Sequence, residues 1–394
     1  MPQDVDGLKK KLEGLKVALA HDYLVQEGGA ERVLSAFQKL FPKAPTFVIA
    51  HNPKRSHPDF RGKDIRTSFL DKWPMARSRT PWYLPLLPVA VEHLDFSGFD
   101  LVLSSSSSFA KGIIVPTHTK HVCYLHTTTR FLWEHRINYL ADLQVPNAVR
   151  TFLPLVLHRL RQWDRLAAER PDAFLTNSQT SRARIKRHYG RDASVIYPPV
   201  EIEKIPMSRH EGDYWLAGGR LVPYKRFDLI VKAFSMLNMP LVIFGVGPEL
   251  QKLKEMAGPK TKFVGLVDDE EKTRLYRYAR GFIYPQVEDF GITAVEAMAA
   301  GRPIIAFGQG GATETVVPGK TGTFIEAQTW EDIGDAVIRH HPGDFDPLAI
   351  RQHAEKFSMA NFQNNLMTHL ARVLDLEEQA EEDDLAPTYA TYFD

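Results

Sequence analysis

The 394-residue chain has a single cysteine, almost no net charge and no long hydrophobic run. One cysteine, Cys123, excludes an intramolecular disulfide, which fits a reducing compartment. The 49 basic residues against 48 acidic ones leave a formal charge of +1, which argues against nucleic acid as the main partner. No segment approaches the roughly 20 apolar residues of a membrane span, and the stretch 1–15 is too charged for a secretory signal. We therefore expect a soluble, cytoplasmic protein of two domains.

Short apolar runs alternate with amphipathic helical stretches along most of the chain. The runs are continuous rather than alternating, which is typical of parallel strands covered on both faces. A first series occupies 16–20, 99–103, 121–125, 173–176 and 194–197. A second series occupies 214–217, 241–244, 262–266, 282–284, 303–307 and 323–325. This pattern predicts an α/β fold of two Rossmann-like, doubly wound parallel-sheet domains.

Proline and charge mark the boundaries between the expected domains. Two prolines, Pro198 and Pro199, end the first series, and the polar stretch 201–213 reads as a linker. The expected parts are an N-terminal Rossmann-like domain, a C-terminal Rossmann-like domain, a helix and an acidic tail. Their bounds are 1–199, 200–358, 359–376 and 377–394, respectively.

Two stretches interrupt the pattern. Residues 73–95 are rich in proline, aromatic residues and leucine, and we expect a packed excursion of the first domain rather than a membrane-contacting surface. Residues 158–170 are basic and aromatic, and they read either as a solvated helix face or as a contact for anionic headgroups.

Glycines and cations follow the expected strands at the edge where ligands of parallel sheets bind. Gly28 and Gly29 stand between a strand and a helix, where the backbone can approach an anion. The third glycine of a dinucleotide fingerprint is missing, which weakens a hydride-transfer interpretation. Gly218-Gly219-Arg220 and Lys225 follow a second strand, and the two cations can converge on one polyanion. A tight turn and a solvated basic loop are the bland alternatives.

Two glutamates eight residues apart, Glu288 and Glu296, are the most specific signal. At 3.6 residues per turn they cannot share one helix face, so we expect Glu288 on a loop and Glu296 on a helix that begins near Gly291 and ends at Gly301. The first amides of that helix suit a phosphate, and the carboxylates suit sugar hydroxyls. The alternative is an inward glutamate paired to a lysine.

His126 ends another strand of the first domain, so we expect it at a ligand-facing edge. No D-x-D element stands where a metal would bridge a diphosphate, since Asp268–Asp269 reads as a loop pair. We therefore expect no metal site.

Together these motifs resemble the retaining, nucleotide-sugar-dependent glycosyltransferases of family four, which have the B-type fold. The resemblance runs from Lys16 to about Leu374 and is closest from Tyr284 to Val317. There the chain is similar to bacterial mannosyltransferases of O-antigen and exopolysaccharide synthesis. The block 124–134 also resembles that subgroup, with Thr128 where proline is usual and Glu134 where aspartate is usual.

The resemblance implies two Rossmann-like domains facing across a cleft, with the C-terminal helix crossing back to the first. It implies a donor site of Gly28, Gly29, Arg220, Lys225, Gly265, Leu266, Glu288, Phe290, Gly291, Ile292 and Glu296. Arg220 and Lys225 would neutralise the diphosphate, Glu296 would bind the ribose and Glu288 the donor sugar. His126 would contact that sugar near the anomeric carbon.

Arg130 and Trp133 would lie on the acceptor side. The implied activity is transfer of a hexose, in the first place mannose from GDP-mannose, to a saccharide or lipid-linked saccharide, without a cofactor. A UDP-sugar donor, an epimerase-hydrolase, a phosphorylase and a nucleotide-sugar-binding module are the alternatives. A polyprenyl-diphosphate-linked acceptor would require only surface contact with the inner face of the cell membrane.

Overall fold

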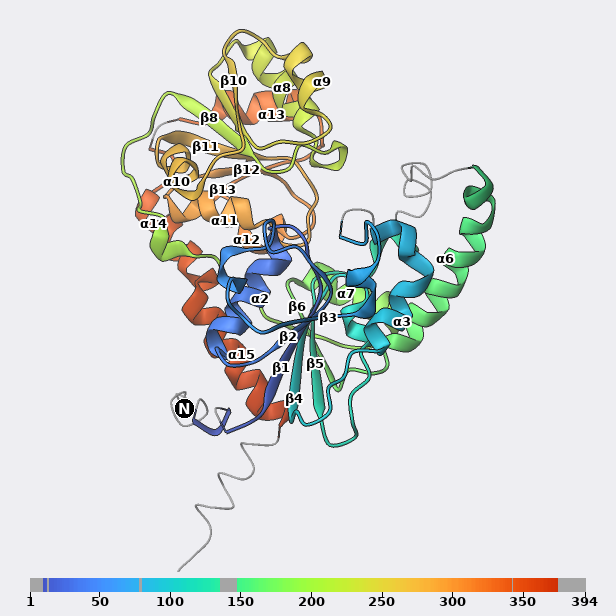
Figure 1. The fold of residues 1–394 in the computed structure, drawn as a ribbon. Helices are drawn as coiled ribbons and strands as arrows, with labels where there is room; N and C mark the ends of the chain where they lie inside the picture. The colour runs from blue at the N-terminus through green and yellow to red at the C-terminus, as the bar shows by residue number, and fades with distance from the viewer. Residues whose placement is uncertain (1–9, 13, 78–79, 135–146, 342, 375–394) are drawn as a thin grey trace, which may run out of the picture. The chain divides into compact units, whose positions relative to one another are not determined.

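The computed structural model describes residues 10–12, 14–77, 80–134, 147–341 and 343–374, which form two compact units (Figure 1). The first unit takes the chain up to Asn177, the segment Ser181–Ile196 and the chain from Phe362 onward. The second unit takes Ser178–Thr180 and Tyr197–Asn361. The expected acidic tail, 377–394, and the last two positions of the expected C-terminal helix lie outside the described residues.

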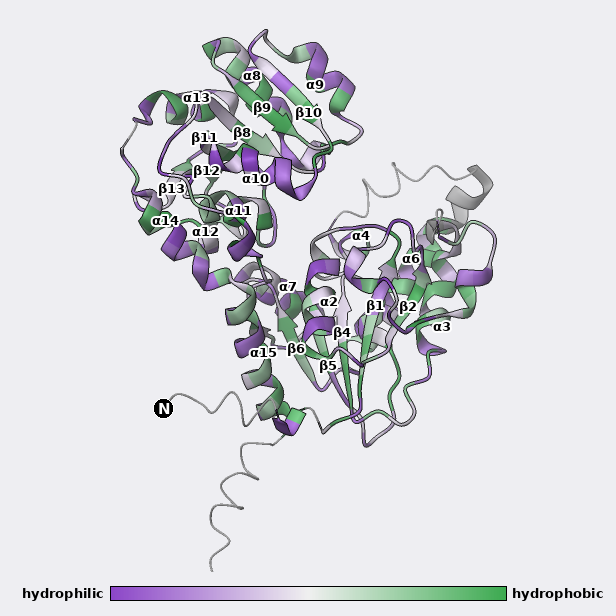
Figure 2. Ribbon diagram, turned by 60° about the vertical axis from the view of Figure 1, so that its left-hand side comes forward, coloured by the Kyte–Doolittle hydropathy of each residue, from purple (hydrophilic) through white to green (hydrophobic). Residues whose placement is uncertain are grey.

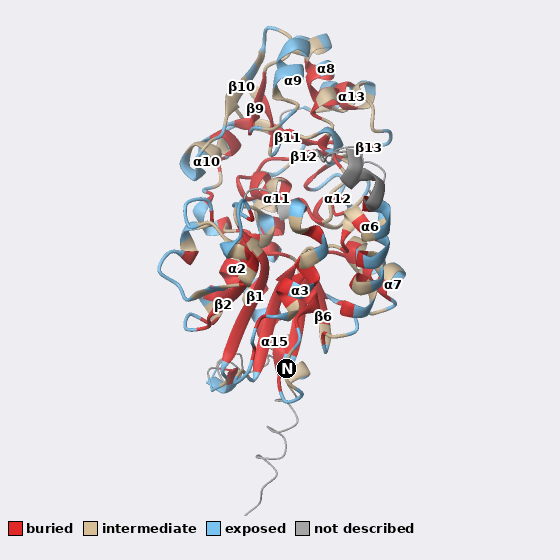
Figure 3. Ribbon diagram, turned by 45° about the vertical axis from the view of Figure 1, so that its right-hand side comes forward, coloured by how far each residue is buried: buried red, intermediate tan, exposed pale blue. Residues whose placement is uncertain are grey.

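A seven-stranded parallel sheet forms the first unit, in the order β3-β2-β1-β4-β5-β6-β7. Its strands are β1 (Val17–Leu24), β2 (Thr46–His51), β3 (Ile65–Thr67), β4 (Leu101–Ser106), β5 (Lys120–Leu125), β6 (Ala173–Thr176) and β7 (Ser194–Val195). Its helices are α2 (Gly29–Leu40), α3 (Leu87–Glu92), α4 (Arg130–Trp133), α6 (Asn147–Ala167) and α7 (Gln179–Tyr189). The central strands β1 and β4 are buried along almost their whole length, as their continuous apolar character predicts. Figure 3 shows β1 in the colour of buried residues.

A six-stranded parallel sheet forms the second unit, in the order β10-β9-β8-β11-β12-β13. Its strands are β8 (Tyr214–Gly218), β9 (Leu241–Phe244), β10 (Thr261–Gly265), β11 (Ala279–Tyr284), β12 (Ile304–Phe307) and β13 (Gly322–Ile325). Its helices are α8 (Phe227–Leu237), α9 (Leu250–Met256), α10 (Asp269–Arg277), α11 (Ile292–Ala299), α12 (Ala312–Thr315), α13 (Trp330–Arg339) and α14 (Pro347–Ala354). The two doubly wound parallel sheets confirm the predicted α/β class.

Neighbouring residues of the second sheet point into opposite cores, because side chains alternate along a strand. One core contains Leu216, Phe282 and Ile304 and is covered by α11 and α14. The other contains Trp215, Ile283 and Ile305 and is covered by α8 and α13. Figure 2 shows these strands as apolar and the outer helix faces as more polar. The packing holds the carboxyl ends of the strands at one edge.

The last helix, α15 (Met359–Val373), begins in the second unit and continues into the first. Phe362 of α15 is buried, and its ring stacks on Phe37 of α2 with 6.1 Å between the ring centroids. Tyr124 of β5 meets the same ring edge-on at 6.0 Å. Helix α15 therefore contributes to the packing of the first unit, although the second unit lies between them in the sequence.

The polar stretch 201–213, which the sequence analysis interprets as a linker, packs partly into the core of the second unit. Ile202 and Ile205 are buried in the core of the second unit, around a short 3-10 turn. The amide of Val200, just before them, donates to the Phe357 carbonyl at 2.9 Å. Two isoleucines three positions apart are enough to dock the stretch, although most of its residues are polar.

Residues 73–95 pack as an excursion of the first unit where they are described, with positions 78–79 outside the description. Leu84, Leu87 and Val91 are buried in the first core, whereas Trp73 and Trp82 are about half exposed. Among the described residues, no helix is both long and apolar enough to cross a membrane.

Candidate functional site

The loop after β8 contains Arg220 and Lys225, the two cations that the sequence analysis predicts to bind the donor diphosphate. The 3-10 turn Pro223–Lys225 buries Lys225, while Arg220 remains exposed at the start of the loop. Arg220 is exposed, and no residue that the structure describes forms an ion pair with it. The loop thus offers one held and one accessible cation.

Lys225 meets Glu288, the first glutamate of the spaced pair. Its Nζ lies 2.8 Å from Glu288 Oε1, and both side chains are mostly buried. The Tyr284 hydroxyl donates to the other oxygen of Glu288 at 2.6 Å. Burial, reinforced by the Glu288 charge, raises the pKa of Tyr284 well above its usual value, so the hydroxyl stays a donor. The structure therefore joins the two predicted motifs at one carboxylate.

Gly291 explains why the loop after Glu288 is so close to Tyr284. Its φ is +94°, and a Cβ there would lie 2.5 Å from the Tyr284 hydroxyl oxygen. Only glycine suits both the backbone conformation and the space. Helix α11 begins immediately afterwards, at Ile292, so its first amides follow the buried Phe290 and Gly291. An N-terminus of this kind attracts anions.

Two further polar groups near this loop were missed by the sequence analysis. Gln286 is 1% exposed, and neither atom of its side-chain amide has a hydrogen-bond partner among the described residues. The buried Thr293 hydroxyl, in the first turn of α11, also has none there. In the sequence, only the position of Gln286, two residues before Glu288 and just after the strand β11, could have indicated it as a candidate site residue.

Glu296 is held inside the second unit. Its carboxylate accepts from the Tyr276 hydroxyl at 3.0 Å and from Lys272 Nζ at 3.3 Å, and it is 4% exposed. Lys272 also pairs with Asp269 at 2.9 Å. An inward glutamate paired to a lysine was the alternative for this position, and the structure has that arrangement. A ribose contact by Glu296 stays a prediction.

The Gly265–Leu266 segment ends β10 at the same edge of the sheet. The Gly265 carbonyl accepts from the Gly245 amide at 2.6 Å, which ties two strand ends together. Leu266 is 82% exposed, an unusual environment for a leucine that is held on an ordered strand end. A contact between Leu266 and a bound nucleotide stays a prediction.

In the first unit, Gly28 and Gly29 connect β1 to α2 as the sequence predicts. Gly28 is the N-cap of α2, and a Cβ on it would lie 2.9 Å from Glu31 Oε2. Glu31 is 4% exposed, and burial raises the pKa of its carboxyl. The glycine therefore leaves room for a buried acid beneath the turn, which the sequence analysis did not identify.

His126 follows β5 and is 9% exposed. Its Nε2 lies 2.8 Å from Ser105 Oγ, and burial lowers its pKa to about 3, with His21 adding to the effect. The ring is therefore neutral at neutral pH. A neutral ring can accept or donate a hydrogen bond, but it is not a reservoir of positive charge.

The two expected acceptor-side residues belong to the short helix α4. Arg130 donates from Nε to the Thr127 hydroxyl at 3.2 Å. The Trp133 indole donates to Asp164 at 2.7 Å, and Asp164 in turn pairs with the fully buried Lys111 at 2.5 Å. Trp133 thus supports a buried ion pair, and its contact with an acceptor stays a prediction.

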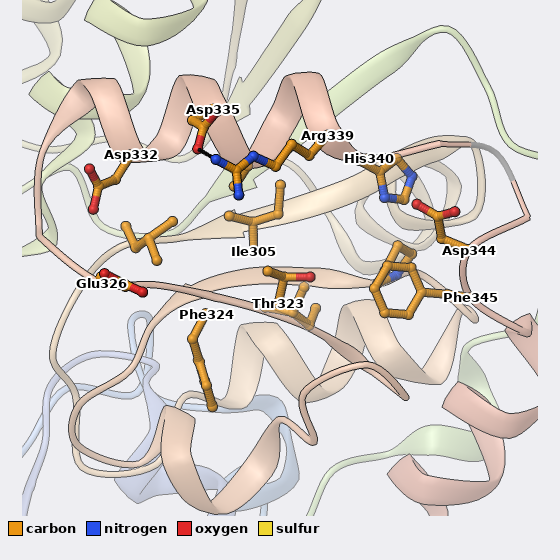
Figure 4. Close-up of a pocket in the computed structure, with 14 residues that line it drawn as sticks. Ile305, Thr323, Phe324, Glu326, Asp332, Asp335, Arg339, His340, Asp344 and Phe345 are labelled. Atoms are coloured by element: carbon orange, nitrogen blue, oxygen red, sulfur yellow. Dashed lines mark ion pairs between the residues drawn. The ribbon is translucent and has the colours of Figure 1, made fainter.

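The predicted residues fall into two sets, one in each unit. Within the second unit the structure brings Lys225 and Glu288 into contact, and within the first it brings His126 against Ser105. A cavity of about 320 Å³ in the second unit contains none of them (Figure 4). Strands β12 and β13 and helix α13 line it, and the ion pair of Asp335 and Arg339 lies at its edge.

Carboxylates near the loops have structural partners rather than a metal geometry. Asp268 caps α10 by accepting from the Glu271 amide at 2.8 Å. In the part of the chain that the structure describes, no three His, Cys, Asp or Glu side chains are grouped so that they could hold a metal ion. A metal-independent reaction stays a prediction.

Comparison with known families identifies the class to which this architecture belongs. Residues 27–204 match the model described as Glycosyltransferase Family 4, and residues 201–344 match the model described as Glycosyl transferases group 1. The chain therefore belongs to the glycosyltransferases that carry these two domains in succession.

Among curated relatives, the chain is similar to a GDP-mannose-dependent alpha-(1-6)-phosphatidylinositol monomannoside mannosyltransferase of Mycobacterium tuberculosis. The two are 32% identical over 192 residues, which are 41% of this chain and 50% of the relative. D-rhamnosyltransferase WbpZ of Pseudomonas aeruginosa is 27% identical over 190 residues, 45% of this chain and 50% of that protein. The chain thus spans about half the length of these relatives.

Solved structures show the same fold. HepE of Anabaena, solved with UDP and glucose, aligns with a TM-score of 0.67 over 91% of this chain and 99% of its own, at 17% identity. Sucrose-phosphate synthase of Thermosynechococcus elongatus aligns with a TM-score of 0.63 over 94% and 99%, also at 17% identity. These likenesses confirm the predicted B-type glycosyltransferase fold.

Proposed function

We propose that the protein is a retaining glycosyltransferase that moves a hexose from a nucleotide sugar to a saccharide acceptor. GDP-mannose is the proposed donor and mannose the proposed transferred sugar, because the mycobacterial relative is named as GDP-mannose-dependent. The proposed acceptor is a saccharide or a polyprenyl-diphosphate-linked saccharide of cell-surface polysaccharide synthesis. The protein would act in the cytoplasm at the inner membrane face.

The contact between Lys225 and Glu288 carries the proposal. It places a cation suited to phosphate beside a carboxylate suited to hydroxyl groups, and Tyr284 orients that carboxylate. A nucleotide sugar presents a diphosphate and sugar hydroxyls in adjacent positions. A ligand with both groups can satisfy Lys225 and Glu288 together, whereas a nucleotide without a sugar satisfies only the cation.

The reaction would be driven by charge stabilisation. Breaking the bond between sugar and phosphate develops negative charge on the departing diphosphate and positive charge on the sugar. Arg220, Lys225 and the first amides of α11 would stabilise the diphosphate without reorganising during the reaction. Attack from the face that the diphosphate leaves, with the phosphate taking the acceptor proton, would retain the anomeric configuration. No carboxylate nucleophile is required in this scheme.

A panel of nucleotides tests the donor. Stabilisation of the protein by GDP, but not by UDP or ADP, in a thermal-shift measurement supports the mannosyl donor. Preference for UDP would contradict it and favour a UDP-sugar donor. Turnover of GDP-mannose with and without acceptor then separates a transferase from an epimerase-hydrolase, which releases sugar without acceptor.

Stereochemistry and metal dependence have their own measurements. NMR of the product made from GDP-α-mannose should show the α-anomer, and the β-anomer would contradict retention. Activity should survive a chelator, because protein cations would take the metal's role. Loss of activity on chelation, with recovery on adding Mg²⁺, would contradict that part of the proposal.

A further inference from the structure

A serine bridges two buried histidines at the ligand-facing edge of the first sheet. Ser105 Oγ lies 2.8 Å from His126 Nε2 and 3.1 Å from His21 Nδ1. The strand register explains the contact, because His21 of β1 lies opposite Ser105 of β4, and His126 directly follows β5. All three residues are buried, with His126 retaining 9% exposure.

A carbonyl oxygen determines which atoms of the hydrogen-bonded series His21, Ser105 and His126 carry hydrogen. His21 Nδ1 also lies 2.8 Å from the Ser105 carbonyl oxygen. A carbonyl only accepts, so Nδ1 of His21 must be the protonated nitrogen. Ser105 Oγ then faces an N–H from His21 and cannot donate to it. The hydroxyl hydrogen must go elsewhere.

Two acceptors lie near that hydroxyl. His126 Nε2 is at 2.8 Å and the Ala30 carbonyl oxygen is at 3.5 Å. The longer distance is outside the range of an effective O–H···O bond, so the hydrogen points at His126. If His126 donated from Nε2 instead, the serine hydrogen would have only the distant Ala30 carbonyl. Hydrogen bonds are therefore donated from His21 to Ser105 and from Ser105 to His126.

The charged groups around these three residues do not change which of their atoms carry hydrogen. Asp22 is occupied by four backbone amides, those of Ser107 to Ala110. Burial raises the pKa of Glu31 and lowers that of His126, and each shift disfavours the charged form. A neutral His126 that accepts at Nε2 carries its hydrogen on Nδ1.

We propose that Ser105 is a positioning residue that fixes the tautomer of His126, so that this ring presents Nδ1–H to the substrate as a neutral hydrogen-bond donor. The inference rests on the proposed function, in which His126 contacts the donor sugar. In that role the ring donates to a sugar oxygen and transfers no proton. Ser105 acts only through His126.

Nitrogen NMR of the full-length protein, labelled at histidine, tests the tautomer without any substrate. His126 should show hydrogen on Nδ1 and none on Nε2, and Ser105→Ala should shift it toward a mixture of tautomers. Ser104→Ala is the matched control, because Ser104 makes the same 2.8 Å contact with His121 from the neighbouring position of β4. It should change the His121 signals and leave the His126 tautomer unchanged. Hydrogen on Nε2 of His126 in the unaltered protein would overturn the proposal.

Activity supplies a second test, with variants of His126 as well as of Ser105. The side-chain nitrogen of asparagine occupies about the place of Nδ1, and that of glutamine about the place of Nε2. His126→Asn should therefore keep about tenfold more kcat/KM than His126→Gln, the effect of one hydrogen bond. Ser105→Thr, which keeps the hydroxyl, should restore kcat relative to Ser105→Ala with little change in KM. Equal or better activity of His126→Gln would contradict the proposal.

The two proposals fail differently. If the NMR spectra show Nδ1–H but no nucleotide sugar is turned over, the tautomer assignment stands and the proposed function fails. If mannose is transferred but Nε2 carries the hydrogen, the proposed function stands and the role of Ser105 is wrong.

Discussion

At the residue scale, the two cations proposed to bind the donor diphosphate have different environments. Lys225 is buried and paired with Glu288, whereas Arg220 is exposed. The pair fixes the position of Lys225 before any ligand arrives, and Arg220 can adapt to a ligand. A charge that is already held in place, like that of Lys225, stabilises a transition state at no reorganisation cost.

Replacing either cation should reduce turnover. We expect Lys225→Ala and Arg220→Ala each to lower kcat/KM for the donor by about 10²- to 10³-fold, because each removes a charge from the departing diphosphate. Steady-state kinetics with the nucleotide sugar measures the effect, and melting temperatures check folding. Lys254→Ala, at an exposed position of α9, is the control. Unchanged turnover in both cation variants would refute the diphosphate assignment.

Buried histidines make the first unit sensitive to acid. His121 is fully buried, and desolvation lowers its pKa from 6.5 to about 3. Between these values the unfolded chain binds a proton that the folded chain does not, so the free energy of unfolding falls as pH falls. Each such histidine contributes a slope of about 1.4 kcal/mol per pH unit in that window.

His121→Gln should flatten this dependence by about one such slope while keeping an amide near Ser104. Chemical denaturation at several pH values between about 6.5 and about 3 measures it. His118→Gln is the control, because His118 is an exposed histidine of the same unit. An unchanged slope in His121→Gln would mean that His121 binds a proton in the folded state.

At the element scale, the loop between β11 and α11 is shaped by one close approach. Gly291 has a positive φ and lies against the Tyr284 hydroxyl, which holds Glu288. The same backbone turn therefore starts α11 and orients the carboxylate. Under the proposed function, the end of β11, this loop and the start of α11 would together bind a ligand that has both a phosphate and hydroxyl groups.

Comparing Gly291→Ala with Gly319→Ala should separate the effect of crowding Tyr284 from that of ordinary backbone strain. Gly319 also has a positive φ, +73°, but nothing lies within 4 Å of a Cβ there. We expect Gly319→Ala to lower the free energy of unfolding by about 1–2 kcal/mol and to leave donor KM unchanged. Gly291→Ala should cost more and raise the donor KM, because its methyl group displaces Tyr284. Equal effects of the two substitutions on KM would contradict this view of the loop.

At the scale of the whole molecule, the chain returns to the first unit after completing the second. Phe357 is buried against Tyr197 and Phe290 in the second unit, and Phe362 is buried against Phe37 and Tyr124 in the first. Five positions of sequence therefore separate side chains that stabilise different cores. The first unit therefore contains a buried side chain that follows the whole second unit in the sequence.

The two phenylalanines form a matched pair for a test by hydrogen exchange. Phe362→Ala should cost about 3–5 kcal/mol and lower protection mainly in β1, β4 and β5. Phe357→Ala should cost a similar amount but lower protection mainly in β8, β11 and β12. Loss of protection in both sheets from either substitution would show that the units unfold together.

Much of the fold was predictable from local patterns. Continuous apolar runs predicted eleven of the thirteen strands in the described part of the chain to within a few residues, because burial on both faces leaves a strong signal; β2 and β3 were not predicted. The edge strand β3 has only three residues, none of them buried, so it carries no such signal. The buried isoleucines of the stretch 201–213 were hidden among polar residues. Short or mixed segments acquire their structure from the core they meet.

The sequence by itself determined the parallel α/β class, the spaced glutamates and the cations after β8, because each depends on order along the chain. Only the tertiary structure decided that Lys225 meets Glu288, that Glu296 is paired to Lys272, and that Ser105 meets His126. Ser105 is one of five consecutive serines, and nothing local distinguishes it from its neighbours. Strand register places it between two histidines, because register is set by the packing of the whole sheet.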